Sequence, residues 1–454
     1  MTGPAVPQGG FELSLAAALL CLALPCGAAR IVGARQGKPW TMALRDMLLC
    51  ASFGAAAFFL VGSWLLFGAD AGGILGLPPG ASHPAAQAGI MGAAEPGDLG
   101  AASFFLYHLG LCLVPFWMFH AVCGDRLTRA GNALMCAAVC AFVFPITGHW
   151  AIGYRWLGPF GSGWLAARGF FDAAGGVVAL VCGAAAALAG LLGGEAPSGE
   201  PIPRTPQPEA LQGDVRQTEA PRPGEPQPET PKPDATPGGG GPGWWIVLGS
   251  WLLAASLAAG ASGGYFFGAL IATSLGGFFG ALAAKAASVA ALAGTKAGLD
   301  WLVSLFRTQG RALTQWRGNL GPEEAVGLAA GVAALSSGLG VAPWWAIPAV
   351  GALAGGLAWT GLAFLGAVLD VTTPARRVLA LGLGGAIGAA LSGLVALPQP
   401  SLFVSDMFVA GGVTLAGIEL TGAAAVAAWT ISVVWLVQRG LLRAQRALAA
   451  LPGE

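Results

Sequence analysis

The sequence carries little charge for its length. Its 454 residues include 22 basic and 22 acidic side chains, so only 10% of the chain is charged and the formal net charge is zero, whereas soluble domains are about one-quarter charged. Hydrophobic residues make up 55% of the chain, and the mean hydropathy is +0.69. These values exclude a soluble enzyme and a disordered protein. Zero net charge also excludes a nucleic-acid binder that works by neutralising phosphates. The composition is that of a polytopic membrane protein whose partner is the lipid bilayer.

Motifs for catalysis, metal binding and disulfide formation are lacking. The eight cysteines lie in or beside apolar segments without a CxxC pair, which is typical of buried thiols that act as small hydrophobic residues. The run Gly382–Gly388 has a faint likeness to a dinucleotide-binding loop. It lies within an apolar stretch, however, where Gly384 and Gly388 favour close helix packing, as do Gly351 and Gly355. We therefore expect no enzyme activity, no cofactor and no metal site.

The first apolar segment, Phe11–Val32, lacks the positive start of a secretory signal peptide. Cys26 and the small residues after it resemble a cleavage site, but no Lys or Arg precedes the segment. We therefore interpret it as the first membrane span.

Runs of about 20 apolar residues mark the membrane spans, because a helix of that length crosses the hydrocarbon core. The sequence contains eleven such runs, at residues 12–32, 44–68, 101–122, 132–152, 171–193, 244–262, 265–284, 322–340, 344–369, 378–397 and 408–438. The predicted fold class is an all-α membrane protein with eleven transmembrane helices.

Basic residues are distributed unevenly among the connections between these spans. If the N-terminus lies outside, 20 of the 22 Lys and Arg residues fall on the inner side, and only Arg155 and Arg168 fall outside. A wrong number of spans would destroy this asymmetry. We therefore predict an N-out/C-in protein of the plasma (cell inner) membrane.

One segment has the opposite composition. Residues 195–243 hold 13 prolines and end in the four glycines Gly238–Gly241, which predicts a disordered cytoplasmic linker. It separates residues 1–194, with spans one to five, from residues 244–454, with spans six to eleven and a short cytoplasmic tail. Because a tandem repeat of five spans has inverted topology, we predict a five-plus-five inverted repeat with an extra last helix. Residues 297–317 are expected to form an in-plane or extended cytoplasmic helix.

Several short motifs resemble those of the ammonium transporter (Amt/Rhesus) family. They are Pro145–Trp150 with Gly153 and Trp156–Leu157 in span four, Gly169–Val178 in span five, Gly331–Gly338 with Pro343 in span eight, and Glu419–Gly422 with Ala427–Trp429 in span eleven. Pro25, Gly33, Gly37 and Lys38 fit the first span and its loop. The resemblance covers nearly the whole chain except the linker and residues 285–317, and it indicates a divergent family member.

The resemblance implies a homotrimer with one narrow pore in each protomer, and ammonium or ammonia as the permeating species. In the family, an aromatic cage and an acidic residue gather ammonium, two phenylalanines gate the pore and two histidines line it. Matching the motifs position by position places the acidic residue at Asp172 and the outer tryptophan at Ile152. The other pathway positions carry aliphatic side chains, with Leu111 and Ala254 at the gate and Leu180 and Leu381 at the histidine positions.

These aliphatic residues change the chemistry of the implied pore. Leucine can neither replace the water around a cation nor accept a proton. Because an unsolvated charge at the middle of a membrane costs several kcal/mol, we expect permeation to be either reduced or lost.

Four polar residues lie in the apolar spans, and each can have a structural or a functional role. Asp172 is placed to cap the outer end of span five, and attraction of the substrate would be an additional role. His108 is expected to make a packed polar contact rather than relay protons, and His149 a structural hydrogen bond. Glu419 stands where the family usually has Gln, and it is either a functional acid or a packing partner.

Two main hypotheses about function follow. The first is an ammonium transporter-like membrane protein. The alternative is a non-conducting scaffold or sensor of the same fold, which engages an unknown cytoplasmic protein through its linker or tail. Transport of another small neutral solute is a third.

Overall fold

The computed structural model describes residues 38–77, 99–151, 163–172, 176–193, 266–293, 322–338, 342–369, 373–396, 399–400, 408–409 and 411–450, with several residues between 21 and 33. The helices of the first half are α3 (Trp40–Ala57), α4 (Ser63–Phe67), α6 (Leu99–Cys123), α7 (Arg129–Ala138), α8 (Phe144–Ala151) and α9 (Gly176–Gly193). Those of the second half are α11 (Phe266–Ala293), α13 (Pro322–Gly338), α14 (Ile347–Leu369), α15 (Thr373–Val395) and α16 (Val413–Ala449). Two short antiparallel strand pairs lie in the connections: β1 (Ala69–Ala71) with β2 (Leu75–Leu77), and β3 (Gln399–Pro400) with β4 (Phe408–Val409).

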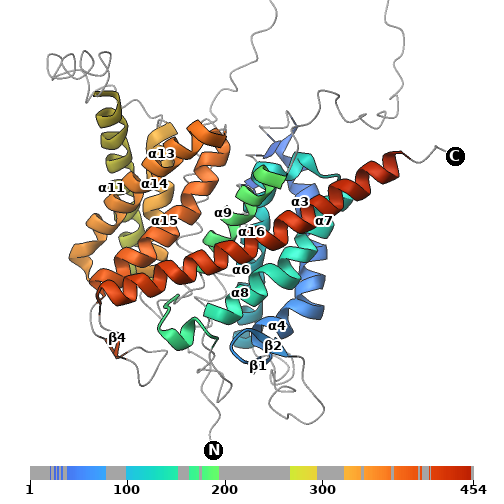
Figure 1. The fold of residues 1–454 in the computed structure, drawn as a ribbon, viewed down its shortest axis with the longest axis horizontal. Helices are drawn as coiled ribbons and strands as arrows, with labels where there is room; N and C mark the ends of the chain where they lie inside the picture. The colour runs from blue at the N-terminus through green and yellow to red at the C-terminus, as the bar shows by residue number, and fades with distance from the viewer. Residues whose placement is uncertain are drawn as a thin grey trace, which may run out of the picture.

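The helices form one bundle of the all-α membrane type (Figure 1). Among the described residues, seven helical segments are long and apolar enough to cross a membrane. With α11 and α13, helices occupy nine of the eleven predicted spans. The predicted span at 244–262 and most of the span at 12–32 lie outside the described residues. So do the linker and the helix expected at 297–317.

Several helix ends differ from the predicted boundaries. α11 continues past residue 284 to Ala293, and α16 continues past residue 438 to Ala449. Hydropathy marks where a helix leaves the apolar layer, but the backbone hydrogen bonds continue as long as good helix formers follow. In contrast, the predicted span at 171–193 starts too early, because Phe171 and Asp172 are not helical and Asp172 bonds to the first turn of α9.

Two helix contacts recur in both halves of the chain, whereas α11 packs against α13 far more closely than α3 packs against α6. In the first half α3 packs against α7 and α6 against α9, and in the second half α11 packs against α14 and α13 against α15. The helices α9 and α15, each the fifth span of its half, meet between the halves. These matched pairs are the ones that a five-plus-five repeat predicts.

Glycines allow the helices of the second half to approach closely. A Cβ added at Gly355 on α14 would overlap the backbone of Gly280 on α11. The same is true of Gly351 against Gly276, Gly384 against Ala330 and Gly388 against Ala334. The packing role predicted for these glycines is therefore confirmed.

Two spans of the first half contain a π-helical turn. Phe58–Gly62 joins α3 to α4, and Val139–Val143 joins α7 to α8, so each span is one continuous helix. The two π-helical turns pack together, and a Cβ at Gly62 would overlap the backbone carbonyl of Cys140. Such turns are frequent near functional sites. Here they precede the ends of α4 and α8, which contribute to the candidate site.

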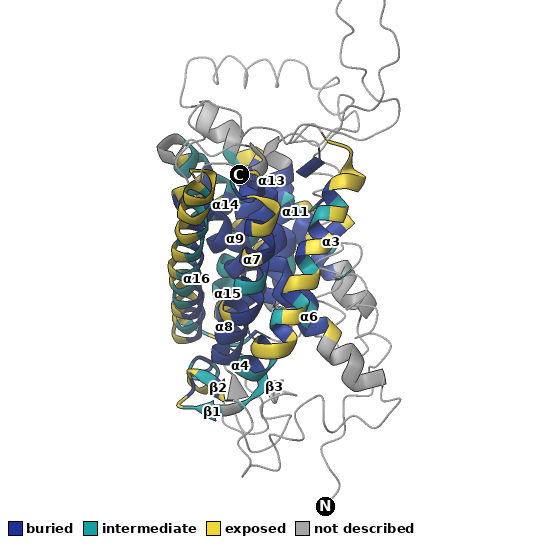
Figure 2. Cartoon of the chain, turned by 90° about the vertical axis from the view of Figure 1, so that its right-hand side faces the viewer, coloured by how far each residue is buried: buried dark blue, intermediate teal, exposed yellow. Residues whose placement is uncertain are grey.

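Burial divides the bundle into a packed interior and an apolar surface. Large side chains such as Phe58, Phe116 and Phe144 are completely buried. Exposed residues follow one side of α3 and α16 in Figure 2, and many of them are hydrophobic, such as Leu60 and Leu436. An apolar outer surface is what contact with lipid requires.

Six of the eight cysteines are buried, as the sequence predicts. The prediction is wrong for Cys26, which is exposed, because the buried positions of this segment include Pro25, Ala29 and Val32, spaced four and three residues apart. All eight cysteines are free thiols. Within the described residues, no group of three or more His, Cys, Asp or Glu side chains could hold a metal ion.

Candidate functional site

Asp172 lies directly before α9 and caps its N-terminus. Its Oδ1 accepts a hydrogen bond from the backbone N–H of Val177 at 3.2 Å, and its Oδ2 accepts one from Val178 at 2.9 Å. The residue is 9% exposed. The predicted cap is therefore confirmed, and both carboxylate oxygens contribute to it.

Glu419, in the second turn of α16, lies beside Asp172. Its Oε1 accepts a hydrogen bond from the backbone N–H of Phe171 at 2.7 Å. The residue is 2% exposed, and its Oε2 has no hydrogen-bond partner among the described residues. The ring of Phe170 lies against Gly422, one turn further along α16, so the segment before α9 is held on α16 by two contacts.

His149 ties the end of α8 to the connection after α4. Its Nδ1 is 3.0 Å from the carbonyl oxygen of Leu66, and its Nε2 is 3.1 Å from Oδ1 of Asp70. Both partners accept, so both bonds form when each ring nitrogen carries a proton. Asp70 Oδ1 also accepts from the backbone N–H of Gly73 at 2.7 Å. The predicted structural role of His149 is confirmed.

Three tryptophans surround the same end of the bundle. The ring of Trp150 lies 5.8 Å from the rings of both Trp164 and Trp429, with edge-to-face geometry. Its indole N–H donates to the carbonyl of Ile74 at 2.7 Å, and Arg168 lies 5.2 Å above the ring of Trp164. Aromatic residues with a polar edge are typical of the membrane–water boundary.

His108 and Leu111 lie one turn apart on α6. The ring of His108 makes edge-to-face contacts with Phe67 at 5.0 Å and with Tyr107 at 5.4 Å, and it is 5% exposed. This agrees with the predicted packed contact. Leu111 is completely buried.

Leu180 and Leu381 lie at the crossing of α9 and α15. Leu180 is 1% exposed, and its side chain is 3.6 Å from where a Cβ at Gly385 would lie. Leu381 is partly buried and packs against the main core. The fold thus brings these two sequence-predicted positions to one helix crossing. Ile152 and Ala254 lie outside the described residues.

A line of small polar groups crosses the bundle near Leu180. The sulfur of Cys182 on α9 is 3.3 Å from the hydroxyl of Thr147 on α8 and 3.3 Å from that of Thr430 on α16. Both threonines are completely buried. The hydroxyl of Thr147 also donates to the carbonyl of Val143 at 2.9 Å, which satisfies it within its own helix.

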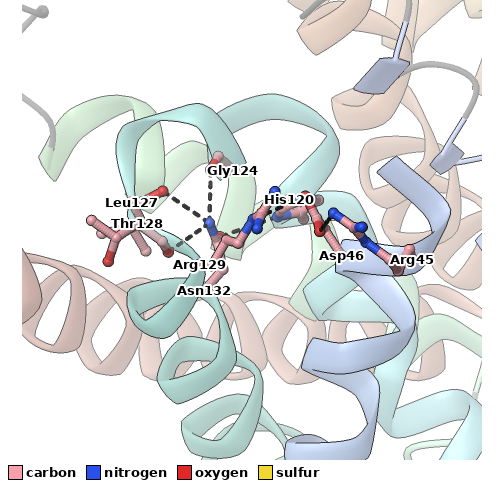
Figure 3. Close-up of polar contacts among 8 residues, drawn as sticks. All are labelled: Arg45, Asp46, His120, Gly124, Leu127, Thr128, Arg129 and Asn132. Atoms are coloured by element: carbon pink, nitrogen blue, oxygen red, sulfur yellow. Dashed lines mark hydrogen bonds and ion pairs between the residues drawn. The ribbon is translucent and has the colours of Figure 1, made fainter. Parts of the chain in front are cut away.

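At the opposite end of the bundle, Asn132 fastens the turn between α6 and α7 (Figure 3). Its Nδ2 donates to the carbonyls of Gly124 at 2.8 Å, Leu127 at 3.1 Å and Thr128 at 3.2 Å. Its Oδ1 lies 3.1 Å from Nδ1 of His120, which is the donor because the amide oxygen can only accept. The residue is 4% exposed.

Charged side chains at this end of the bundle form exposed ion pairs and caps. Asp46 lies between Arg45 at 3.4 Å and Arg129 at 3.3 Å, and both arginines are largely exposed (Figure 3). Exposed ion pairs of this kind contribute little to stability. Arg126 donates to the carbonyl of Gly190 at 2.9 Å, and Gln438 donates to the same carbonyl at 3.2 Å, so the C-terminal end of α9 is capped from two sides.

The arrangement can therefore offer two kinds of environment to a solute. One end presents a pair of acidic residues, Asp172 and Glu419, within an aromatic surrounding. Between the ends, Leu111 and Leu180 have almost no exposed surface, so water does not reach them in this structure. Sequence reasoning missed Asp70, Asn132 and the thiol–hydroxyl line, because their partners are far away in sequence and only the packed bundle brings them together.

Comparison with known proteins points to one family. Residues 13–206 match the model of the Ammonium Transporter Family. Among solved structures, a Sensor Amt Protein is similar with a TM-score of 0.66 and 18% identity, covering 97% of this chain and 94% of that chain. A search of curated protein sequences gave no match.

Two fungal proteins have the same fold. Mep2 from Candida albicans is similar with a TM-score of 0.59 and 20% identity, covering 94% of this chain and 83% of that chain. Mep2 from Saccharomyces cerevisiae is similar with a TM-score of 0.59 and 17% identity, covering 98% of this chain and 86% of that chain. At these identities the structural likeness establishes the fold, and it does so along nearly the whole chain.

Proposed function

Because the chain is an ammonium transporter-like, multi-pass integral membrane protein, we propose that it lets ammonium or ammonia permeate the plasma membrane, and that it is not an enzyme. The observation that carries this proposal is the shared fold over 97% of the chain, together with the family match over residues 13–206. The buried acid Asp172 at the outer end of α9 supports it, because a negative group there favours a cation.

The proposed pathway begins at Asp172 and Ile152 on the predicted outer side. It continues past the gate positions Leu111 and Ala254 and then between Leu180 and Leu381. Leucine side chains can admit a small neutral molecule when they move apart, but they cannot solvate a cation. Since Leu111 and Leu180 are almost completely buried, permeation requires these side chains to be displaced. We therefore expect ammonia, and not ammonium, to cross the apolar region.

Reconstitution in liposomes tests the proposal. An ammonium pulse is applied outside vesicles that contain a pH-sensitive dye, and the interior should become alkaline faster than in protein-free vesicles, because entering ammonia takes up a proton. A current measured on a supported membrane would instead reveal net movement of the cation. Alkalinisation at the protein-free rate, with no current, would reject permeation.

We also propose a homotrimer, as the resemblance implies. The outward faces of α14 and α11 carry exposed apolar residues that could cover one another between copies, including Leu353, Leu357, Phe364, Leu275 and Phe278. The mass of the detergent-solubilised protein, measured by light scattering, checks the assembly. A mass equal to one chain would contradict it.

The alternative is a scaffold or sensor that does not conduct. The burial of Leu111 and Leu180 favours this alternative, and one solved relative is itself named a Sensor Amt Protein. It would engage an unknown cytoplasmic protein through residues 195–243 or the chain end. Pull-downs with the intact chain and with residues 195–243 deleted would return different partners if the linker serves this role.

A further inference from the structure

One buried acidic oxygen in the outer part of the bundle has no assigned role. Glu419 is 2% exposed, and only its Oε1 is bonded, to the backbone N–H of Phe171. Its Oε2 is buried without a hydrogen-bond partner among the described residues. A buried carboxylate oxygen without a donor is unfavourable, so something small has to complete this site.

The neighbouring carboxylate cannot supply that partner. Asp172 follows Phe171 in the chain, and both of its oxygens already accept bonds from the N-terminal turn of α9. Two acidic groups therefore lie side by side within the protein, and no ion pair to either occurs among the described residues. Neighbouring buried carboxyls without a counter-charge hold a proton or a cation between them.

The other titratable groups at this end are already engaged. His149 faces the carbonyl of Leu66 and the carboxylate of Asp70. Arg168 donates to the carbonyl of Trp164 at 2.9 Å and covers the ring of that residue. His108 packs edge-to-face on Phe67 and Tyr107. Among the described carboxylate groups of this end, Glu419 Oε2 is a buried oxygen without a hydrogen-bond partner, while Tyr107 of α6 lies near Asp172.

We propose that Glu419 is a proton-binding site, which takes up the proton that ammonium loses before ammonia enters the leucine-lined region. An N–H bond of ammonium breaks, its electron pair stays on nitrogen as neutral ammonia, and an O–H bond forms at Oε2 of Glu419. Charge is conserved, because one cation and one carboxylate become two neutral groups. The proton then returns to the outer solution. This inference rests on the permeation proposed above, but the existence of the proton site can be measured without transport.

The position of Glu419 suits this role. Beyond it, Leu111 and Leu180 offer no group that could solvate a charge, so ammonium has to lose its proton at the outer end. The resemblance places Gln at this position in relatives, and an amide cannot hold that proton. Glu419 can thus bind a proton at the entrance of a pathway in which Leu180 and Leu381 occupy the positions of the family's histidines.

Infrared spectroscopy of the purified protein provides the direct test. A protonated carboxyl group has a C=O stretching band that an ionised one lacks. Adding ammonium at neutral pH should make such a band appear in the wild-type protein, and carbon-13 labelling of glutamate should shift it, which identifies the residue type even if a variant fails to fold. The band should be missing in Glu419→Gln, which keeps the acceptor for Phe171, and present in the control Asp46→Asn at the opposite end of the bundle.

Transport then separates this inference from the proposed function. In liposomes we expect Glu419→Gln to slow ammonium-driven alkalinisation at least about tenfold, which corresponds to a barrier higher by about 1.4 kcal/mol. If the wild-type protein shows the glutamate band but does not transport, the proton site is supported and the proposed function is rejected. An active wild-type protein without the band, or with an unchanged Glu419→Gln rate, would overturn the proposal for Glu419.

Discussion

The backbone carbonyl of Leu180 lies against Gly382 where α9 crosses α15, so that a Cβ at residue 382 would come within 2.8 Å of the carbonyl oxygen. The side chain of Leu180 covers Gly385, one turn further along. Because the glycines of α15 have no side chains to separate the two helices, the leucine itself fills the space between them. The middle of the proposed pathway is therefore closed by one well-packed aliphatic residue.

Shortening this residue should open the pathway. We expect Leu180→Ala to raise ammonium-driven alkalinisation of liposomes severalfold, because the change removes the side chain that fills the crossing. It should also cost about 2–5 kcal/mol of stability, as buried leucine truncations do.

The matched control for this change is Leu335→Ala. Leu335 is also 1% exposed, but it packs against Gly276 on α11, away from the proposed pathway. It should lose stability in the same way and leave the flux unchanged. Equal flux in both variants and the wild type would mean that Leu180 is only a packing residue.

The glycine contacts of the second half can be tested on a single helix. Gly355 on α14 faces the backbone of Gly280, whereas Gly361, less than two turns away, has no neighbouring atom within 4 Å of an added Cβ. We expect Gly355→Leu to destabilise the protein by about 1–3 kcal/mol or more through overpacking, and Gly361→Leu to be nearly neutral. Unfolding temperatures in detergent measure both, and similar temperatures would argue against close packing at Gly355.

The turn at the opposite end of the bundle depends on Asn132. Replacing it with Leu removes the donor to three carbonyls and the oxygen that accepts from Nδ1 of His120. We expect a loss of about 2 kcal/mol or more, since buried polar groups are left unpaired. Gln445→Ala, which breaks one exposed bond to Thr128 on the same turn, should change stability by less than about 1 kcal/mol. The prediction fails if the two variants unfold at the same temperature.

The link between His149 and Asp70 should hold the β1–β2 connection in place. His149→Ala removes the bonds to Leu66 and Asp70, so amide hydrogen exchange in residues 69–77 should become faster. Trp150→Phe, which removes only the bond to Ile74, should have a smaller effect near Ile74. Unchanged exchange in His149→Ala would show that the β1–β2 pairing is sufficient by itself.

Several features of the site were accessible from sequence because they depend on local chemistry. The cap formed by Asp172 is predicted, since an acid at the N-terminal end of an apolar span suits the positive end of the helix dipole. His149 was predicted to make a structural hydrogen bond, but its partner, Asp70, lies 79 residues earlier in the chain. Glu419 was recognised as an intramembrane acid, while its contact with Phe171 joins residues 248 positions apart. No local pattern contains such pairs.

The sequence by itself determined that this is a multi-pass membrane protein of helices, because low charge and apolar runs of fixed length leave the chain no other way to satisfy its backbone in lipid. It also determined which glycines would be helix contacts, because small residues at regular spacing can serve little else in an apolar span. Only the tertiary structure decided that Leu111 and Leu180 are buried away from water, and that Glu419 has an oxygen beside Asp172 with no hydrogen-bond partner among the described residues. Exposure and hydrogen bonding are properties of packed neighbours, and those neighbours come from distant parts of the chain.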